Sequence, residues 1–451
     1  MTIREADGKR EKKPEAPVWT KRMLAALDNG VKGGRWYGLM DKVYAPSTLQ
    51  AAWQMVRANQ GAAGIDRINI KRFEAHEEQY LQELHESLKD GTYRPDAVRR
   101  VYIPKSDGKQ RPLGIPTVKD RIVQAAVKIV IEPIFEHEFL PMSYGFRPGR
   151  GCKDALREVD GHIKAGYTWV VDADLKSYFD TIPHDLLMEQ VEQRISDGKL
   201  LNLIRLFLNQ EVMDDMDRWT PTGGTPQGAV LSPLLANIYL HPLDKLVTEA
   251  GMKMVRYADD FVILCESKTQ AQDALRLVRE WTEDNGLTLH PDKTHLGDCS
   301  QPGQGFEFLG YRFEAGRRWI RRKSIKALRE KVRKMTRRNC GMSMGYIIDD
   351  LNPMLRGWFN YFKHAYRTQY KGIDGFIRRR LRAILLQWNK GNGLGIAEKA
   401  HRQWPNTYFA EMGLFTMHEA RLIACQSRCR NCQPESRVRE NRTHGSEGGA
   451  G

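Results

Sequence analysis

The clearest indication of the fold is the segment Met254-Val255-Arg256-Tyr257-Ala258-Asp259-Asp260-Phe261-Val262-Ile263-Leu264. Two short apolar runs flank a turn that carries adjacent acids, a pattern typical of a β-hairpin. Neighbouring carboxylates repel each other at a strand tip, and a divalent cation bound there would offset that repulsion. Taken alone, however, an Asp-Asp pair at a solvated turn is the simpler explanation.

A second acidic element favours a metal site over a simple solvated turn. Val170-Val171-Asp172-Ala173-Asp174-Leu175 is a strand that runs into carboxylates, and Ser177-Tyr178-Phe179-Asp180 follows it closely. Two Mg²⁺ ions about 4 Å apart need carboxylates from more than one element. Three protein acids suffice, because Mg²⁺ keeps waters and substrate phosphates as its other ligands. Asp174 and the pair on a neighbouring hairpin could supply that set, although Asp172 and Asp174 alone could equally be polar residues at a sheet edge.

A third element is Thr225-Pro226-Gln227-Gly228, which precedes an apolar helical pattern that begins near Leu231. A Gln-Gly pair before a helix brings an amide side chain and bare backbone close to an approaching ligand. Without its context, the segment would be a simple loop followed by a capped helix.

Strands and helices are mixed around these three elements. Two strand-like runs separated by Asp107-Gly108 predict a hairpin over residues 99–116. Helical periodicity predicts further elements over residues 47–57, 73–88, 120–139, 200–207 and 231–246. Strands separated by helices, with hairpins among them, indicate an α/β or α+β layered sheet.

The chain becomes strongly basic from Arg317 onward. Residues 317–340 hold twelve Lys or Arg and one acidic residue, Glu330, and still keep one apolar face. This pattern predicts an amphipathic helix with a basic outer side. Two more helical patterns follow with short links, so we expect a small three-helix bundle.

Composition and charge fit a globular protein with a polyanionic partner. The 451 residues, 41% hydrophobic and 28% charged, suggest two or three packed domains. The net charge of +15 favours a polyanion, although a basic protein without such a partner is the alternative. No apolar run approaches the roughly 18 residues that a membrane span requires. The charged start lacks a secretory signal, so we expect a cytoplasmic protein.

Seven cysteines are scattered along the chain, which favours reduced thiols over a disulfide framework. Only Cys425, Cys429 and Cys432 cluster, and they are one ligand short of a zinc site unless His418 or His444 completes it. Free thiols are the alternative interpretation of this cluster.

The order of these elements resembles the conserved blocks of reverse transcriptases, and most closely those of group II intron-encoded proteins. The resemblance covers roughly residues 47–390. It rests on blocks in the family's order, at residues 59–66, 103–116, 143–150, 174–180, 226–233, 257–260, 286–294 and 308–310.

The resemblance implies an α+β right-hand polymerase fold, with fingers and palm built from antiparallel sheet and helices and an all-α, three-helix thumb or maturase domain. The expected organisation is a mobile leader, an N-terminal extension with the fingers, a palm with the catalytic site, the thumb, and a short basic, disordered tail. These segments would cover residues 1–46, 47–160, 161–315, 316–420 and 421–451.

The resemblance also implies roles for single residues. Asp174, Asp259 and Asp260 would hold two Mg²⁺ ions, with the carbonyl of Leu175 as a further ligand. Lys105, Lys109 and Arg111 on the fingers hairpin would clamp the triphosphate of the incoming dNTP. Gln227 would contact its sugar, and the ring of Phe179 would clash with a ribonucleotide 2′-hydroxyl, although Phe179 could also be a core aromatic.

A member of this family is an RNA-directed DNA polymerase that extends a DNA primer on an RNA template. It binds its group II intron RNA, assists splicing, and copies the intron into DNA at a target DNA during retrohoming. Trp358 to Phe362 and the basic helix before them resemble the maturase domain. A domesticated group II-like, retron or defence polymerase without a splicing role is the alternative. So is an RNA-binding splicing factor with a decayed polymerase site, against which the intact carboxylates argue.

The resemblance fails near the C-terminal end. Many intron-encoded proteins continue into a zinc-type HNH endonuclease, whereas Cys425, Cys429 and Cys432 lack the paired CxxC arrangement of that module. We therefore expect no second-strand cleavage by this chain.

Overall fold

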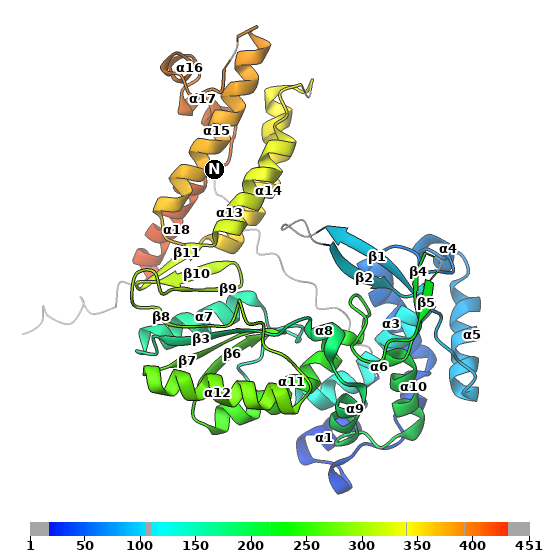
Figure 1. Ribbon diagram of the computed structural model, residues 1–451. Helices are drawn as coiled ribbons and strands as arrows, with labels where there is room; N and C mark the ends of the chain where they lie inside the picture. Colours follow the sequence, from blue (N-terminus) through cyan, green and yellow to red (C-terminus); the bar gives the residue numbers. More distant parts are fainter. Residues whose placement is uncertain (1–17, 105–109, 216, 340, 392, 432–451) are drawn as a thin grey trace, which may run out of the picture. The chain divides into compact units, whose positions relative to one another are not determined.

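A computed structural model describes residues 18–104, 110–215, 217–339, 341–391 and 393–431 (Figure 1). The chain forms two compact units, which divide between Leu309 and Gly310. The second unit thus begins slightly before the thumb boundary expected at residue 316.

The first unit is organised around a four-stranded antiparallel sheet with the strand order β6-β7-β3-β8. Its strands are β6 (Lys253–Tyr257), β7 (Asp260–Cys265), β3 (Trp169–Asp174) and β8 (His295–Asp298). Side chains alternate between the two faces of a strand. Val171 and Ala173 belong to the main core, so Asp172 and Asp174 share the opposite face of β3.

Helices and one short strand cover this sheet. α12 (Lys268–Asp284) packs on β3 and β7, and α7 (Cys152–Lys164) packs on β6. α11 (Ser232–Glu249), which is buried along most of its length, contacts β6 and α12. β9 (Phe306–Phe308) lies against β3 and β7. Figure 1 shows α12 below the sheet and β9 above it.

A second sheet in the same unit has the strand order β2-β1-β4-β5. It contains β1 (Val98–Pro104), β2 (Gln110–Ile115), β4 (Val212–Asp214) and β5 (Asp217–Trp219). The expected hairpin at residues 99–116 is confirmed, because β1 and β2 pair antiparallel from Arg99 opposite Ile115 to Pro104 opposite Gln110. Residues 105–109, with Lys105 and Lys109, lie outside the described residues.

Most helices predicted in this unit are confirmed with small shifts of their ends. The single helix expected over residues 73–88 is instead two helices, α4 (Ile70–Glu74) and α5 (Glu77–Asp90), which break at Ala75 and His76. α3 (Pro46–Asn59) packs on α6 (Val118–Glu136), the most extensively buried of the N-terminal helices. The unit also contains α8 (Tyr178–Thr181), α9 (His184–Glu192) and α10 (Gly198–Leu208).

The described part of the expected leader packs into this unit. It contains α1 (Lys21–Asn29) and α2 (Met40–Val43), separated by the 3-10 turn η1 (Lys32–Gly34). The backbone amides of Leu39 and Met40 donate to the Asp197 carboxylate at 2.7 and 2.8 Å. Leu39 and Val43 are buried, although too few apolar residues occur here to produce a clear pattern in the sequence.

The second unit begins with a hairpin of β10 (Tyr311–Glu314) and β11 (Arg317–Ile320). The three expected helices follow as α13 (Arg322–Met335), α14 (Met344–Phe362) and α15 (Thr368–Trp388). α16 (Glu398–Gln403) and α17 (Asn406–Glu411) are short. α18 (Met417–Asn431) packs against α14 and α15, so the start of the expected disordered tail at residue 421 lies inside a helix.

The other expectations for the C-terminal end fall on residues whose positions are not described. Residues 432–451, which include Cys432 and His444, lie outside the described residues, as do the side chains of Cys425 and Cys429. The possible zinc site therefore stays a prediction. Within the described ranges, no helix is both long and apolar enough to cross a membrane.

Candidate active site

The three acids predicted to act together lie at one end of the β6-β7-β3-β8 sheet. Asp174, the last residue of β3, is the direct cross-strand partner of Asp260, the first residue of β7. Such partners have Cβ atoms roughly 5 Å apart. Asp259 precedes Asp260 in the turn from β6, next to Ala258, whose φ is +60°. Asp174 thus shares one edge with Asp259 and Asp260, which lie 85 and 86 positions further along the sequence.

The carboxylates of this edge affect one another electrostatically. Burial raises the pKa of Asp259, and the negative charge of Asp174 raises it further. The positive charges of Arg111 and Arg256 oppose this rise in pKa. Burial also raises the pKa of Asp172 to about 7, with the charges of Asp260 and Asp174 as the next causes. The site concentrates negative charge that a cation would neutralise.

One protein cation already lies at this edge. The ammonium of Lys293 forms an ion pair with Oδ2 of Asp174. In the part of the chain that the structure describes, no three His, Cys, Asp or Glu side chains are arranged to coordinate a metal ion. The donors available are carboxylate oxygens, which are the ligands that Mg²⁺ prefers. The donor chemistry therefore fits Mg²⁺, whereas the side-chain arrangement is that of an ion pair with lysine.

The segment after α12 fixes the end of β3. The backbone amide of Lys176 donates to Thr288 O at 2.8 Å, and the amide of His290 donates to Asp174 O at 2.7 Å. Leu175, the predicted additional ligand, is bridged to Leu289 and has a buried side chain. These bonds place Lys293 beside Asp174, an arrangement that the sequence analysis did not predict.

A buried arginine that the sequence pattern did not predict lies beneath the Asp-Asp turn. Arg256 is fully buried, and its guanidinium donates to both carboxylate oxygens of Asp244 in α11. The same group donates to Ala258 O at 3.0 Å and to Asn237 Oδ1 at 2.9 Å. It therefore binds the carbonyl of the left-handed residue that precedes Asp259. An arginine inside an apolar strand was the available signal.

A glycine packs against the same turn. A Cβ at Gly145 would lie 2.2 Å from the backbone nitrogen of Ala258, so only glycine fits there. Asn237 Nδ2 donates to Gly145 O at 2.8 Å, and the amide of Tyr144 donates to Arg256 O at 2.9 Å. The block at residues 143–150 thus buttresses the turn that carries Asp259 and Asp260.

The predicted nucleotide-contacting residues lie where the fingers hairpin meets the loop before α11. Gln227 accepts from Arg111 Nε at 2.8 Å and donates to Asp180 Oδ2 at 3.1 Å. The amide of Gly114 donates to Gln227 O at 2.7 Å. A Cβ at Gly228 would lie 2.5 Å from Gly114 O, so the close approach of the two segments requires glycine. The structure thereby brings Arg111 to Gln227.

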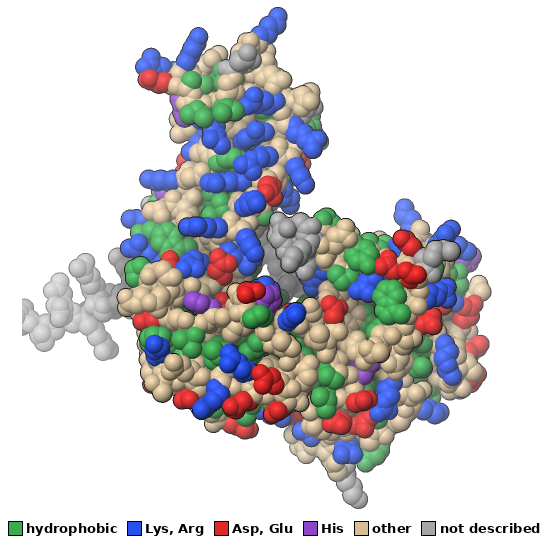
Figure 2. All heavy atoms as spheres, in the orientation of Figure 1, with side chains coloured by type: hydrophobic (Ala, Val, Ile, Leu, Met, Phe, Trp, Pro, Cys, Tyr) green, Lys and Arg blue, Asp and Glu red, His purple; other side chains and the backbone are tan. Residues whose placement is uncertain are grey.

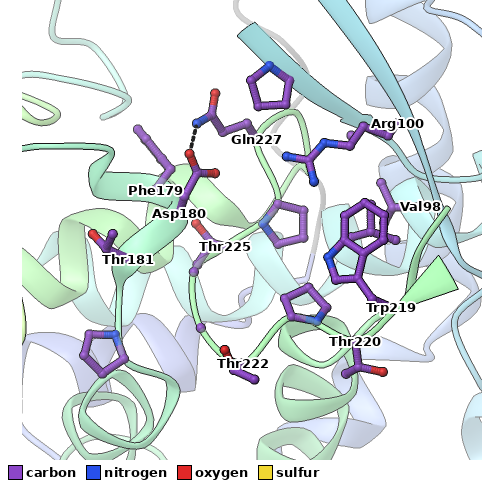
Figure 3. Close-up of a pocket in the computed structure, with 18 of the residues that line it drawn as sticks. Val98, Arg100, Phe179, Asp180, Thr181, Trp219, Thr220, Thr222, Thr225 and Gln227 are labelled. Atoms are coloured by element: carbon purple, nitrogen blue, oxygen red, sulfur yellow. Dashed lines mark hydrogen bonds between the residues drawn. The ribbon is translucent and has the colours of Figure 1, made fainter. Parts of the chain in front are cut away.

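A cavity of about 790 Å³ lies beside these residues (Figure 3). Phe179 and Asp180 lie on one side of it, and Arg100 and Trp219 lie on the other, with the guanidinium 5.4 Å from the indole centroid. Phe179 is half-buried, and its carbonyl accepts from the amide of Thr225 at 2.6 Å. Phe179, the predicted steric residue, thus lines the cavity and also packs against the main core.

Comparison with known protein families gives two matches. Residues 103–313 match the family described as reverse transcriptase (RNA-dependent DNA polymerase). Residues 325–406 match the family described as group II intron, maturase-specific domain. The first match contains the three carboxylates, Arg111, Phe179 and Gln227, and the second contains α14, α15 and most of α13.

Individual relatives agree with these matches. Protein YkfC of Escherichia coli is 35% identical over 315 residues, which are 61% of this chain and 82% of YkfC. The group II intron-encoded protein LtrA of Lactococcus lactis is 42% identical over 212 residues, which are 47% of this chain but only 35% of LtrA. Nuclear intron maturase 4 of Arabidopsis thaliana is 29% identical over 279 residues, 60% of this chain and 33% of the relative.

Proposed function

Because this chain belongs to the group II intron-encoded reverse transcriptases and maturases, we propose that Asp174, Asp259 and Asp260 bind the two Mg²⁺ ions of its polymerase site. Reverse transcriptases are RNA-directed DNA polymerases with a right-hand fold, and they use divalent metal ions. The observation that carries the proposal is the direct pairing of Asp174 with Asp260 beside Asp259.

Bound there, the ions would lower the pKa of the primer 3′-hydroxyl and neutralise the pyrophosphate leaving group. Asp174 and Asp260 would hold the two sides of this site, because Asp174 is the last residue of β3 and its cross-strand partner Asp260 is the first residue of β7. Leu175 would offer its carbonyl as a further ligand. Lys293 forms an ion pair with Asp174, so its ammonium would leave that carboxylate when the ions bind.

The incoming dNTP would lie between the fingers hairpin and the palm. Arg111 is positioned by Gln227 and would bind the triphosphate together with Lys105 and Lys109. Gln227, held by Arg111 and Asp180, would contact the sugar. The ring of Phe179 would exclude a 2′-hydroxyl by steric clash.

The two units would divide the work of the protein. Residues 47–160 and 161–315 would form the fingers and palm, and residues 316–420 the thumb and maturase domain. This second part would bind group II intron RNA, assist its splicing and support retrohoming into target DNA. The match of residues 325–406 to the maturase-specific domain favours this role over that of a domesticated polymerase without splicing.

Primer extension by an Asp259→Asn variant tests the metal site. With an RNA template, a DNA primer, dNTPs and Mg²⁺, we expect extension to fall roughly a thousandfold, because several kcal/mol of charge stabilisation is lost. Asp273→Asn on the exposed side of α12 is the matched control and should extend the primer normally. Unchanged extension by Asp259→Asn would refute the proposed site.

A further inference from the structure

Three arginines surround one phenylalanine in the second unit. Phe376 of α15 is buried, and the guanidinium carbons of Arg329, Arg333 and Arg379 lie 5.5, 5.4 and 5.4 Å from its ring centroid. Arg329 and Arg333 come from α13, whereas Arg379 lies one turn after Phe376 in α15. Together with Gly372 and Gly375 these residues line a hollow of about 300 Å³. We call these six residues the Phe376 groove.

The described residues leave the positive charge of the Phe376 groove unbalanced. Among the residues that the structure describes, none of its three arginines forms an ion pair with a carboxylate. The neighbouring Arg380 has a lowered pKa, caused by burial and by the charges of Arg338, Arg333 and Arg379. The packing of like charges here is unfavourable unless an anion joins them.

The groove continues along α13. A second hollow of about 420 Å³ shares Arg329 and Arg333 and is further lined by Arg322, Ile325 and Lys326. Glu330 is the one acidic residue in α13. Figure 2 shows many Lys and Arg side chains and few acids on the visible face of the helical unit. The basic surface is therefore an elongated track, which suits a polymer of phosphates better than a single small anion.

The glycines of the groove are not explained by packing within the described chain. Gly372 and Gly375 lie inside α15, where glycine is less favourable than alanine. A Cβ added to either would meet no described atom within 4 Å, and neither has a positive φ. Neither internal packing nor backbone conformation therefore requires glycine. A ligand that approaches the bare helix backbone closely would require it.

We propose that the Phe376 groove binds the sugar-phosphate backbone of group II intron RNA. The arginines would hold a phosphate, since guanidinium groups match phosphate oxygens. Gly372 and Gly375 would leave space for the adjoining ribose, whose 2′-hydroxyl is part of how RNA is recognised. The inference rests on the proposed maturase function and assigns its binding site. All six residues lie within the maturase-specific match and outside the reverse transcriptase match, which favours intron RNA over the template–primer duplex.

A double variant, Gly372→Ala with Gly375→Ala, tests the groove without changing its charge. The probe is a group II intron transcript, with an unrelated duplex RNA of equal length as competitor. We expect the full-length variant to melt at the same or a higher temperature, because alanine favours the helix. Its Kd for the intron transcript should nevertheless rise at least about tenfold, since two methyl groups obstruct the ligand.

The matched control is Gly161→Ala in α7, another exposed helical glycine with open space around it. It should leave the Kd unchanged. Arg333→Gln should weaken binding and reduce the dependence of the Kd on salt by about one ion. If the double-alanine variant bound the intron transcript with the wild-type Kd, the assignment of the groove would be wrong. Preferential binding of that transcript by the wild type would still support the maturase function. Failure of the wild type to prefer the intron transcript would instead overturn both.

Primer extension separates the two nucleic acids that could occupy the groove. On an RNA template with a DNA primer and no intron sequence, the double-alanine variant should keep the wild-type kcat and KM. A rise of the template–primer KM as large as the rise of the intron RNA Kd would show that the groove serves the polymerase substrate, and would overturn the assignment.

Discussion

The carboxylate edge of the first unit concentrates negative charge, whereas the Phe376 groove of the second unit concentrates positive charge. Each gathers like charges that the described chain neutralises only in part, so each requires an ion or a ligand of the other sign. The two regions differ in the structural elements that hold their charged side chains in place. The carboxylates lie at strand ends above a buried arginine network, whereas the groove lies on helix surfaces where Arg329 and Arg333 are exposed. A metal site needs strict geometry, and a phosphate track needs mainly charge and space.

The largest effect is expected from a substitution at Asp174, which should nearly abolish primer extension but leave RNA binding unchanged. Asp174→Asn should reduce primer extension roughly a thousandfold, because it removes a proposed metal ligand. The same variant should bind intron RNA with the wild-type Kd, because the groove belongs to the other unit. Extension assays and filter binding on one protein preparation measure both values. A parallel loss of RNA affinity would mean that the two regions do not work independently.

The rigidity of the carboxylate edge can be tested at Arg256. Arg256→Lys keeps the buried positive charge for Asp244 but cannot make all the bonds to Ala258 O, Asn237 and Asp244. We expect kcat to fall about ten- to a hundredfold with little change in the KM for dNTP, because a misplaced Asp259 slows the chemical step. Circular dichroism should show an intact fold.

A normal kcat in Arg256→Lys would show that the turn needs only the charge. Arg256→Met should be more damaging to folding, since it leaves Asp244 buried without a partner and costs about 3–5 kcal/mol of stability. A comparison of the two variants therefore separates positioning of the turn from stability of the unit.

A smaller effect is expected at the cavity of Figure 3. Phe179→Ala should raise the incorporation of ribonucleotides relative to deoxyribonucleotides roughly tenfold, since the proposed clash with the 2′-hydroxyl disappears. Intron RNA binding should not change. Single-nucleotide extension with ATP and dATP measures the ratio. An unchanged ratio would assign Phe179 to packing alone.

The smallest effect concerns pH and Asp172. Its pKa is raised to about 7 by burial and by the charges of Asp260 and Asp174, so the folded state binds a proton more tightly than the unfolded state. This carboxyl therefore costs stability above pH 7, and the cost disappears as the pH falls below the unfolded pKa. The rise of this pKa from 3.8 to about 7 corresponds to about 4 kcal/mol at pH 8, and burial of the replacing amide offsets most of it. Asp172→Asn should therefore raise the free energy of unfolding by roughly 1 kcal/mol at pH 8.

At pH 4 the stabilisation by Asp172→Asn should be much smaller. Chemical denaturation at the two pH values measures the difference. Equal stabilisation at pH 8 and pH 4 would mean that ionisation of the Asp172 carboxyl does not cause the stabilisation.

Local patterns in the sequence are enough to predict the strands and turns that carry the acids. Asp174 ends an apolar strand and Asp259 lies between two apolar runs, so the residues around each acid indicate its place at a strand end. The pairing register that places Asp174 opposite Asp260 does not follow from these patterns, because strands far apart in sequence do not specify it.

Long-range polar contacts were beyond sequence reasoning. Arg256 finds Asp244 and Asn237 on α11, and no spacing rule connects a strand residue to those helix positions. Asp374 accepts from the amides of Met417 and His418, which fixes the start of α18, a helix that the sequence pattern did not reveal. Weakly apolar stretches such as residues 39–43 become buried only because other elements receive them.

The proposed polymerase site requires the three carboxylates to bind a pair of divalent ions. Mn²⁺ binding, followed by electron paramagnetic resonance on the enzyme with template–primer and a non-hydrolysable dNTP analogue, tests it most directly. We predict two tightly bound Mn²⁺ ions per wild-type chain and the loss of at least one in Asp259→Asn. Equal numbers of bound ions in the wild type and the variant would contradict the account.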